Sequence, residues 1–189
     1  MNALQPVSLR MDDDAPRPRF SQPRVAIIHY WLVSMRGGER VLERLMHLFP
    51  QADIFTHVYD PTKMSNVINE AKVTTSFINK MPLSRRWYQY YLPLMPMALE
   101  QFDLNGYDLI ISSESGPAKG VITDPTSHHM CYCHSPMRYL WDHYHQYRNG
   151  ANPIARAAMP MLYHKLREWD VSSSARVDNF VANSNFIRQ

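Results

Sequence analysis

The sequence predicts an α/β fold, with a doubly wound, mainly parallel sheet and helices on both of its faces. Short apolar runs typical of strands alternate along the chain with helical patterns, which indicates parallel strands joined by right-handed crossovers. The clearest unit is the segment 24–49, in which an apolar run, a turn with two glycines and an amphipathic helix follow one another. This order typically begins a Rossmann-like domain, in which ligands bind at the carboxyl ends of the strands.

In that first unit, residues 25–28 are all apolar, as in a parallel strand that is buried on both faces. The helix that follows repeats its apolar side chains at a period of about 3.6 residues, and Pro50 ends it. The turn contains Gly37 and Gly38 without the G-x-G-x-x-G spacing of dinucleotide-binding proteins. The sequence therefore gives little support to a nicotinamide or flavin site.

Further strands are predicted over residues 52–59, 73–77, 107–112, 129–133 and 179–182. A short polar helix is predicted to end near residue 69, another to begin with Ser84 as its cap and to kink or end at Pro93, and a third to span about residues 152–170. Residues 1–22 lack periodicity and are rich in proline and aspartate, so we expect a disordered arm before a single domain over residues 23–189. Because the sequence stops at Gln189, within the apparent first turn of another helix, we expect it to be one half of a larger fold.

Bulk composition excludes several classes of protein. The net charge of +3 over 189 residues forms no concentrated basic stripe, so no nucleic-acid partner is predicted. The two cysteines stand two residues apart and form no disulfide framework, which favours a reducing, cytoplasmic compartment. No apolar run reaches the length of about 18 residues that a membrane span requires. The G-x-S-x-G and Walker motifs are also missing, so hydrolase and P-loop readings lose their main support.

The glycine turn at the end of the first strand is a candidate ligand site. Gly37 and Gly38 let the backbone approach a phosphate or sugar closely, at a helix N-terminus that favours an anion. A tight turn that needs positive φ is an equally good explanation of the two glycines. Arg36 either binds an anion in the same turn or is simply an exposed, solubilising side chain.

The segment 128–144 is the densest cluster of chemically active side chains. A zinc site is disfavoured, because Cys131 and Cys133 lie on one face of the predicted strand while His134 lies on the other. We therefore predict no metal and expect both cysteines to be small buried groups. His134 follows the strand directly, where an imidazole can bind a ligand hydroxyl or support developing charge; its alternative role is to satisfy local backbone groups.

Two further segments mix aromatic and charged residues. Arg138, Tyr139, Trp141 and Asp142 suit a sugar, which offers both C–H faces and hydroxyls, although a helix that packs its aromatic rings inward explains them as well. A second run is predicted either to contact an anionic membrane surface or to pack on the sheet; its first four residues are Arg85, Arg86, Trp87 and Tyr88.

Several strings together resemble family 4 retaining glycosyltransferases of bacterial polysaccharide synthesis, most of all the mannosyltransferases of O-antigen and exopolysaccharide assembly. These strings are HYWLVSMRGGERVLE, YDLIISSESGPAKG, CYCHSPMRYLWDHY and VANSNFIRQ, and they span about residues 24–189. The resemblance implies a GT-B fold, in which two Rossmann-like domains face each other over a cleft. It identifies this chain with the N-terminal, acceptor-side domain of such a protein.

The resemblance also implies roles for individual residues. Gly37 and Gly38 would lie near the donor diphosphate, and His134 would be the catalytic residue that contacts the transferred sugar. Asn183 and Ser184 would lead towards the second domain. The acceptor would be flanked by Arg36, Glu114, Arg138, Tyr139, Trp141 and Asp142.

The activity that the resemblance implies is retaining hexosyl transfer without a metal or cofactor. The donor would be a nucleotide-sugar, GDP-mannose or a UDP-sugar, and the acceptor a lipid-linked glycan at the inner face of the cytoplasmic membrane. The sequence contains no second domain with the family's paired-glutamate motif, so we expect these residues alone to transfer little or no sugar. A non-catalytic module that binds a glycan or a protein, with a Rossmann-like fold, is the alternative.

Overall fold

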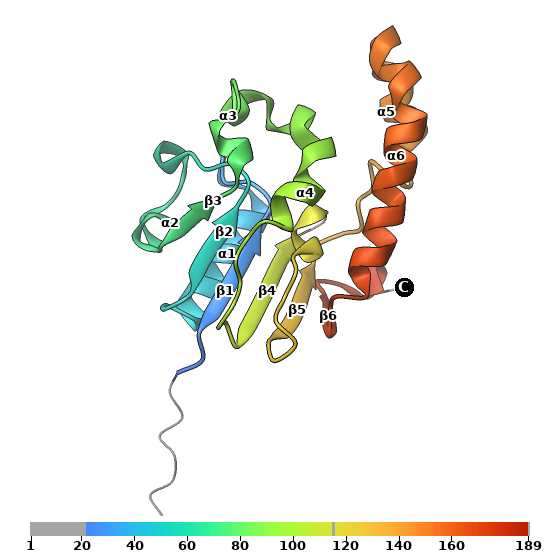
Figure 1. The fold of residues 1–189 in the computed structure, drawn as a ribbon. Helices are drawn as coiled ribbons and strands as arrows, with labels where there is room; N and C mark the ends of the chain where they lie inside the picture. The colour runs from blue at the N-terminus through green and yellow to red at the C-terminus, as the bar shows by residue number, and fades with distance from the viewer. Residues whose placement is uncertain (1–21, 115, 189) are drawn as a thin grey trace, which may run out of the picture.

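The computed structural model describes residues 22–114 and 116–188, and it shows an α/β domain built on one six-stranded sheet (Figure 1). The strand order is β3-β2-β1-β4-β5-β6, and every neighbouring pair is parallel. The strands are β1 (Val25–His29), β2 (Asp53–Thr56), β3 (Val73–Thr75), β4 (Leu109–Glu114), β5 (His128–Cys133) and β6 (Asn179–Ala182). This architecture confirms the doubly wound, Rossmann-like fold class. The predicted disordered arm lies almost wholly outside the described residues.

Helical segments connect the strands. The α-helices are α1 (Gly37–Leu48), α2 (Asn66–Glu70), α3 (Ser84–Trp87), α4 (Met95–Leu99), α5 (Tyr144–Gly150), α6 (Pro153–Ser174) and α7 (Asn185–Arg188). The 3-10 segments are η1 (Pro61–Lys63), η2 (Phe77–Lys80), η3 (Tyr88–Leu94) and η4 (Pro117–Gly120). Among these described helices, none combines the length and the apolar character needed to cross a bilayer.

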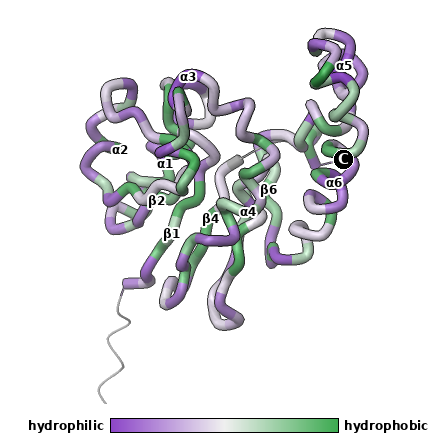
Figure 2. The backbone as a smooth tube through the Cα atoms, turned by 45° about the horizontal axis from the view of Figure 1, so that its top comes forward, coloured by the Kyte–Doolittle hydropathy of each residue, from purple (hydrophilic) through white to green (hydrophobic). Residues whose placement is uncertain are grey.

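Both faces of the sheet are covered by apolar side chains, which is why β1 is buried throughout. Alternate residues of β1 point to opposite faces. Ala26 and Ile28 belong to a cluster with α4 and η4, whereas Val25 and Ile27 belong to a cluster with α1 and α2. Figure 2 shows β1 and β4 among the most hydrophobic parts of the backbone. The continuous apolar run in the sequence thus reflects a central strand between two helical layers.

The helix α6 stands beside the sheet and extends beyond the carboxyl ends of the strands (Figure 1). Its buried Leu166 packs with Met137 and Leu140, from the segment between β5 and α5. Near its carboxyl end, Trp169 packs against the cluster on the α4 face of the sheet. The helix therefore fixes the segment that follows β5 against the body of the domain.

The segment 84–102 differs most from its prediction. A helix capped by Ser84 and kinked or ended at Pro93 was expected, but the chain forms α3, η3 and α4, with Pro93 inside the 3-10 segment. Ser84 is the first residue of α3, and its hydroxyl donates to the carbonyl of Asn79 at 2.9 Å instead of capping the helix. Two prolines, Pro93 and Pro96, remove backbone donors, and this favours short turns over one continuous helix.

Smaller differences occur at the ends of elements. The second predicted strand is shorter in the structure, because residues 57–59 leave the sheet and only Tyr59 forms an isolated bridge, with Leu32. The predicted helix over residues 152–170 runs on to Ser174. Cys131 is buried as expected. The expectation that Cys133 is buried is wrong, because this residue is the last of β5 and is only partly covered at the carboxyl end of the strand.

Candidate functional site

The strand order reverses direction between β1 and β4, so the carboxyl ends of these two strands mark the topological switch point of the sheet. His29 ends β1 and lies directly opposite Ser113 of β4. The helix α1 begins a few residues after β1, with Gly37 and Gly38 as its first residues. Doubly wound sheets bind ligands at the topological switch point. In this structure several polar side chains lie close together there.

At the centre of the group lies a buried pair that the sequence did not reveal. His29 and Glu39 are both completely buried, and His29 Nε2 lies 3.8 Å from Glu39 Oε1. Both ring nitrogens of His29 and this carboxylate oxygen make no hydrogen bond in the structure, whereas the other carboxylate oxygen accepts the backbone N–H of Arg36 at 2.9 Å. Buried polar atoms without partners are rare in folded proteins, and a functional role is one explanation for them.

The His29 ring packs under the glycine turn. A methyl group added at Gly38 would lie 3.4 Å from His29 Cε1 and 3.6 Å from the Tyr30 hydroxyl, whereas one added at Gly37 would meet nothing within 4 Å. The outer side of the turn is therefore open, and the inner side rests on the His29–Glu39 pair. The first N–H groups of α1 have no partners within the helix, and N–H groups in this position can bind an anion.

His134 joins the site from β5. It follows the last residue of that strand, and its Nε2 lies 3.3 Å from the hydroxyl of Ser113. Burial lowers the pKa of His134, His29 lowers it further, and Glu39 opposes both effects. The lowered pKa means that the ring is neutral at pH 7 and can both donate and accept a hydrogen bond.

The pKa of Glu39 depends on opposing effects. Burial alone would raise it, but the contacts with His29 and with backbone N–H groups outweigh burial, so the pKa of this carboxyl is lowered. Glu39 is therefore ionised at pH 7, directly beneath the start of α1. A buried carboxylate at this position stabilises the helix N-terminus and holds the turn in place.

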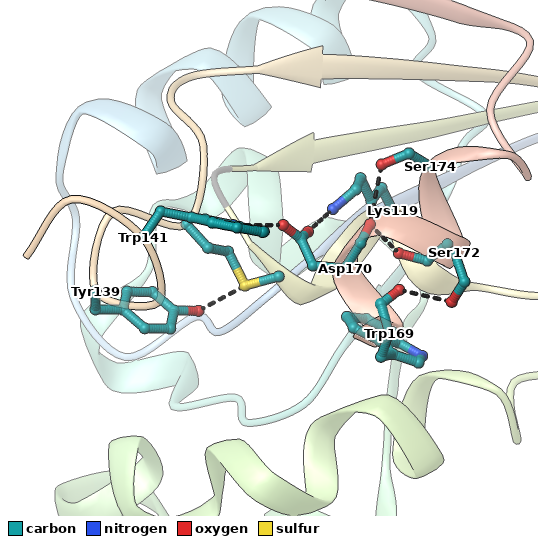
Figure 3. Close-up of polar contacts among 9 residues, drawn as sticks. Lys119, Tyr139, Trp141, Trp169, Asp170, Ser172 and Ser174 are labelled. Carbon is teal, nitrogen blue, oxygen red and sulfur yellow. Dashed lines mark hydrogen bonds and ion pairs between the residues drawn. The ribbon is translucent and has the colours of Figure 1, made fainter. Parts of the chain in front are cut away.

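A second group of predicted residues lies on the loop after β5 and on α6 (Figure 3). The indole N–H of Trp141 donates to Asp170 at 2.9 Å, and the other oxygen of Asp170 contacts Lys119 of η4. The hydroxyl of Tyr139 donates to the sulfur of Met137 at 3.0 Å. These contacts fix Trp141 while leaving 43% of it exposed.

Arg167 of α6 completes this aromatic group. Its guanidinium lies over the ring of Tyr144 at 4.5 Å and over the ring of Trp141 at 5.8 Å, and its Nε donates to the carbonyl of Leu140 at 2.7 Å. An open depression nearby is lined by residues that include Arg138, Tyr139 and Tyr147. This surface offers aromatic faces and hydrogen-bonding groups together, the combination that the sequence suggested for a sugar.

The predicted site residues therefore fall into three places. Gly37, Gly38 and His134 share the switch point, with the exposed Arg36 at the start of α1. Arg138, Tyr139, Trp141 and the exposed Asp142 belong to the segment held by α6. Asn183 and Ser184 lie in the third place, where they line another depression with Cys133, beyond the end of β6. The backbone of Glu114 ends β4 opposite Cys133, in the strand and not in the turn after it.

Sequence reasoning missed His29, Glu39, Ser113, Lys119 and Asp170. The only signal for His29 was a polar residue at the end of a buried strand, and the only signal for Glu39 was an acidic residue in the first turn of the next helix. Lys119 and Asp170 are 51 residues apart in the sequence, so their contact had no local signal. Within the described part of the chain, no group of three or more His, Cys, Asp or Glu residues is placed to hold a metal ion.

No protein-family model matches this sequence, and no curated protein matches it. A solved structure that does match is the apo form of the lipopolysaccharide outer core galactosyltransferase WaaB. The similarity covers 59% of this chain and 34% of that one, at 18% sequence identity and a TM-score of 0.33. A likeness this distant gives no indication of activity or substrate.

Proposed function

We propose that this chain is the acceptor-side domain of a nucleotide-sugar-dependent, retaining hexosyltransferase that acts on a lipid-linked glycan. One observation carries the proposal: a helix N-terminus and a neutral imidazole both lie at the switch point of the sheet. The helix N-terminus is that of α1, at Gly37 and Gly38, and the imidazole is that of His134. The resemblance of four sequence strings to family 4 glycosyltransferases supports the same conclusion.

The helix N-terminus suits the diphosphate of a sugar donor. The leaving group in such a transfer is a nucleoside diphosphate, whose negative charge grows as the glycosidic bond breaks. Backbone N–H groups and the positive end of the α1 dipole stabilise that charge without the need for a cation. The lack of a side chain at Gly37 and Gly38 lets the phosphate oxygens come close to the backbone.

The neutral state of His134 suits the transferred sugar. In glycosyl transfer, positive charge develops at the anomeric carbon in the transition state. An imidazolium next to that carbon would oppose this charge, whereas a neutral ring can hydrogen-bond a sugar hydroxyl at no such cost. The contact with Ser113 fixes the ring and leaves Nδ1 for the sugar.

The acceptor side of the site is proposed to include Arg36, the backbone end of β4 at Glu114, and the segment with Arg138, Tyr139, Trp141 and Asp142. Mannose from GDP-mannose is the proposed transferred sugar, with UDP-sugars as the alternative donors. The reaction is proposed to need neither a cofactor nor a metal. Asn183 and Ser184 are proposed to face a second, donor-binding domain, so binding is a better test of this chain than turnover.

A second candidate is a non-catalytic module that binds glycans. The exposed rings of Trp141 and Tyr147, 43% and 56% exposed, favour it, because they need no nucleotide to bind a sugar face, and Tyr147 lines the depression beside Arg138. This module would use the α6 side of the domain alone. The switch point at Gly38 and His134 would then have no ligand.

Chemical-shift perturbation separates the two candidates. The full chain is titrated with GDP-mannose, UDP-glucose and UDP-galactose, and separately with mannose oligosaccharides that lack a nucleotide. The proposal expects a nucleotide-sugar to shift the amides of Gly37 and Gly38 and the ring of His134, and expects His134→Ala to weaken that binding.

Shifts confined to Trp141 and its neighbours, caused by oligosaccharides alone, would establish the module instead. No response at Gly38 or His134 to any of the three nucleotide-sugars would refute the transferase proposal. The Asp103→Asn variant, at an exposed loop position, is a control that should bind as the parent does.

A further inference from the structure

A basic aromatic tip, defined here as Leu83, Arg85, Arg86, Trp87 and Tyr90, projects from the turn around α3. We infer that this tip docks the domain on the surface of an anionic lipid bilayer. The inference rests on the exposed chemistry of the tip and does not depend on sugar transfer. Figure 1 shows α3 beyond the carboxyl ends of β1 and β2, at the end of the molecule that carries the candidate site.

The tip exposes large apolar and aromatic groups in a short span. Leu83 is 59% exposed, Trp87 is 50% exposed and Tyr90 is 80% exposed, and the rings of Trp87 and Tyr90 lie 6.2 Å apart. Tryptophan and tyrosine concentrate at membrane–water interfaces, where an apolar ring and a polar group are both satisfied. A patch of this kind on a protein surface typically marks an interaction site.

Leu83 holds its exposed position at a backbone cost. It is the one described residue other than glycine with positive φ, at 51°, a conformation that costs about 1–2 kcal/mol for a residue with a Cβ. Neighbouring bonds hold the turn: the hydroxyl of Tyr91 donates to the carbonyl of Pro82 at 2.7 Å, and that of Ser84 donates to the carbonyl of Asn79. Leu83 thus combines a fixed turn with an exposed apolar side chain, which is available for contact with a bilayer.

The charge of the tip is of one sign. The sequence contains no aspartate or glutamate between Glu70 and Glu100, whereas Lys80, Arg85 and Arg86 lie in that interval; Lys72 also lies there, but it is paired with Asp53 at the amino ends of the strands and does not belong to the tip. The nearby carboxylate is Asp60 of the preceding loop, whose pKa is lowered chiefly by the hydroxyl of Thr62 and also by Arg85. One carboxylate leaves an excess of positive charge, and each lysine or arginine near an anionic membrane contributes about 1 kcal/mol to binding.

The tip is anchored to the core by Tyr88. With Arg85, Arg86 and Trp87 this residue was predicted either to contact a membrane or to pack on the sheet; only 7% of it is exposed, so for Tyr88 the membrane alternative is wrong. Its ring packs on that of Trp31 at a centroid distance of 4.4 Å, inside a buried cluster. Tyr90 takes its place on the outer surface. The tip is therefore a fixed projection, so docking requires little ordering of side chains on binding.

Lipid is a better match than protein or nucleic acid. Aromatic rings, an exposed leucine and two arginines that outnumber the one nearby carboxylate, Asp60, fit an interface in which apolar chains lie beneath anionic head groups. Docking through the tip would also turn the carboxyl end of the sheet towards the bilayer. A lipid-linked acceptor of the proposed transferase would then lie within reach of the candidate site.

Vesicle co-sedimentation tests the inference with the full chain. Vesicles of phosphatidylcholine alone are compared with vesicles that also contain phosphatidylglycerol, at about 0.1 M and about 0.5 M salt. We expect binding to the anionic vesicles at low salt, and a loss of at least about tenfold in Arg85→Glu/Arg86→Glu, because two attractive charges become repulsive. Trp87→Ala/Tyr90→Ser should weaken the binding that remains at high salt, because those rings act through burial and not through charge.

The matched control is Arg40→Glu/Arg44→Glu, which makes the same charge change at two exposed positions of α1. Equal losses in the two charge variants would show that net charge alone attracts the protein, and would overturn the assignment of the tip. Equal binding to neutral and anionic vesicles, or to neither, would also overturn it. Binding of polyglutamate as tight as that of the vesicles would reassign the tip to an acidic protein. Thermal melting of each variant confirms that it folds, and none of these results changes the nucleotide-sugar titration.

Discussion

The Nζ atom of Lys119 contacts the carboxylate of Asp170, and this contact joins the loop after β4 to the helix α6. Each side chain is only 13% exposed. The second oxygen of Asp170 accepts the indole N–H of Trp141 at 2.9 Å (Figure 3). A single carboxylate thus fixes both the loop next to the switch point and an aromatic residue of the proposed acceptor surface.

Removal of one partner from this pair should destabilise the fold. Lys119→Met leaves Asp170 as a mostly buried carboxylate without its cation, which typically costs about 3–5 kcal/mol before any discount for residual solvent. The free energy of unfolding, measured by urea denaturation, should therefore fall by at least about 2 kcal/mol. Lys165→Ala, in an exposed pair with Glu168, is the control and should cost less than about 1 kcal/mol. Equal effects of the two changes would contradict a structural role for the Lys119–Asp170 pair.

Gly120 should not tolerate a side chain. A Cβ at this position would overlap the indole ring of Trp169, which packs against the buried cluster on the α4 face. Gly120→Ala is expected to lower stability by at least about 1–3 kcal/mol, the usual cost of overpacking. Gly150→Ala, where an added methyl meets nothing within 4 Å, should leave thermal stability unchanged or slightly raised. A Gly120→Ala protein as stable as the parent would show that Trp169 can move aside.

The sequence was sufficient to predict the sheet, because each strand has a recognisable local pattern of residues. The run at residues 25–28 is apolar throughout, and in the structure it is the central strand β1, buried on both faces. β6 (Asn179–Ala182) matches its predicted bounds, although it is an edge strand with mostly exposed side chains. Over residues 84–102 the effect of Pro93 was predicted, but a helix was expected before it where the chain forms the short segments α3 and η3, whose packing only the folded core decides.

The candidate site was predictable only in part. Gly37, Gly38 and His134 stand next to predicted strand ends, so topology alone brought them to the same edge of the sheet. The His29–Glu39 pair was not predictable, because its significance lies in complete burial and missing hydrogen bonds, which are tertiary properties. The position of Trp141 depends on Asp170, a residue 29 positions later in the chain.

His57 should make the protein less stable in acid. Burial lowers the pKa of His57 to about 3, whereas an ordinary histidine titrates near 6.5. Between these two values the unfolded chain binds a proton that the folded chain does not, so stability falls as the pH decreases from 6.5. The fall from this residue amounts to at most about 1.4 kcal/mol per pH unit. Unfolding free energies measured between pH 7 and about pH 4.5 should show it.

The variant His57→Gln isolates that contribution. Glutamine retains a polar group for the Ser76 hydroxyl, which lies 3.1 Å from His57 Nδ1, but it does not titrate. The slope of the unfolding free energy against pH should therefore decrease by an amount that corresponds to at most one bound proton. His129 and His134 should still contribute to the slope, because burial also lowers their pKa values. His47→Gln, at an exposed position of α1, is the control. A parent-like slope in His57→Gln would show that His57 is not the residue responsible.

Glu39 should stabilise the fold at neutral pH. Burial would raise the pKa of its carboxyl, but His29 and backbone N–H groups lower it below the ordinary value of 4.5. Its stabilising contribution is therefore present above pH 4.5 and is lost as the pH falls through the lowered value. Glu39→Gln should reduce stability at pH 7 by about 1–3 kcal/mol. Its effect should shrink in acid.

A double-mutant cycle tests whether this contribution depends on the histidine. Glu39→Gln, His29→Gln and the double variant are compared at pH 7, and residues in direct contact typically show a coupling of about 0.5–3 kcal/mol. Additive effects would mean that Glu39 acts only through the N–H of Arg36, which it accepts at 2.9 Å. In that case the His29–Glu39 distance of 3.8 Å would have no energetic significance.

Gly38 should separate folding from ligand binding. An added methyl would lie 3.4 Å from His29 Cε1, an ordinary contact, so Gly38→Ala should fold with a stability within about 1 kcal/mol of the parent. Gly38 belongs to the first turn of α1, and the proposal requires that a diphosphate approach the backbone of this turn without a side chain in the way. Binding of the nucleotide-sugar that shifts the parent should therefore weaken by about tenfold, which corresponds to about 1.4 kcal/mol. Asp103→Asn, at an exposed loop position, is the control and should bind as the parent does. If Gly38→Ala binds as tightly as Asp103→Asn, the anion does not rest on this turn, and His134 alone would remain as evidence for a ligand at the switch point.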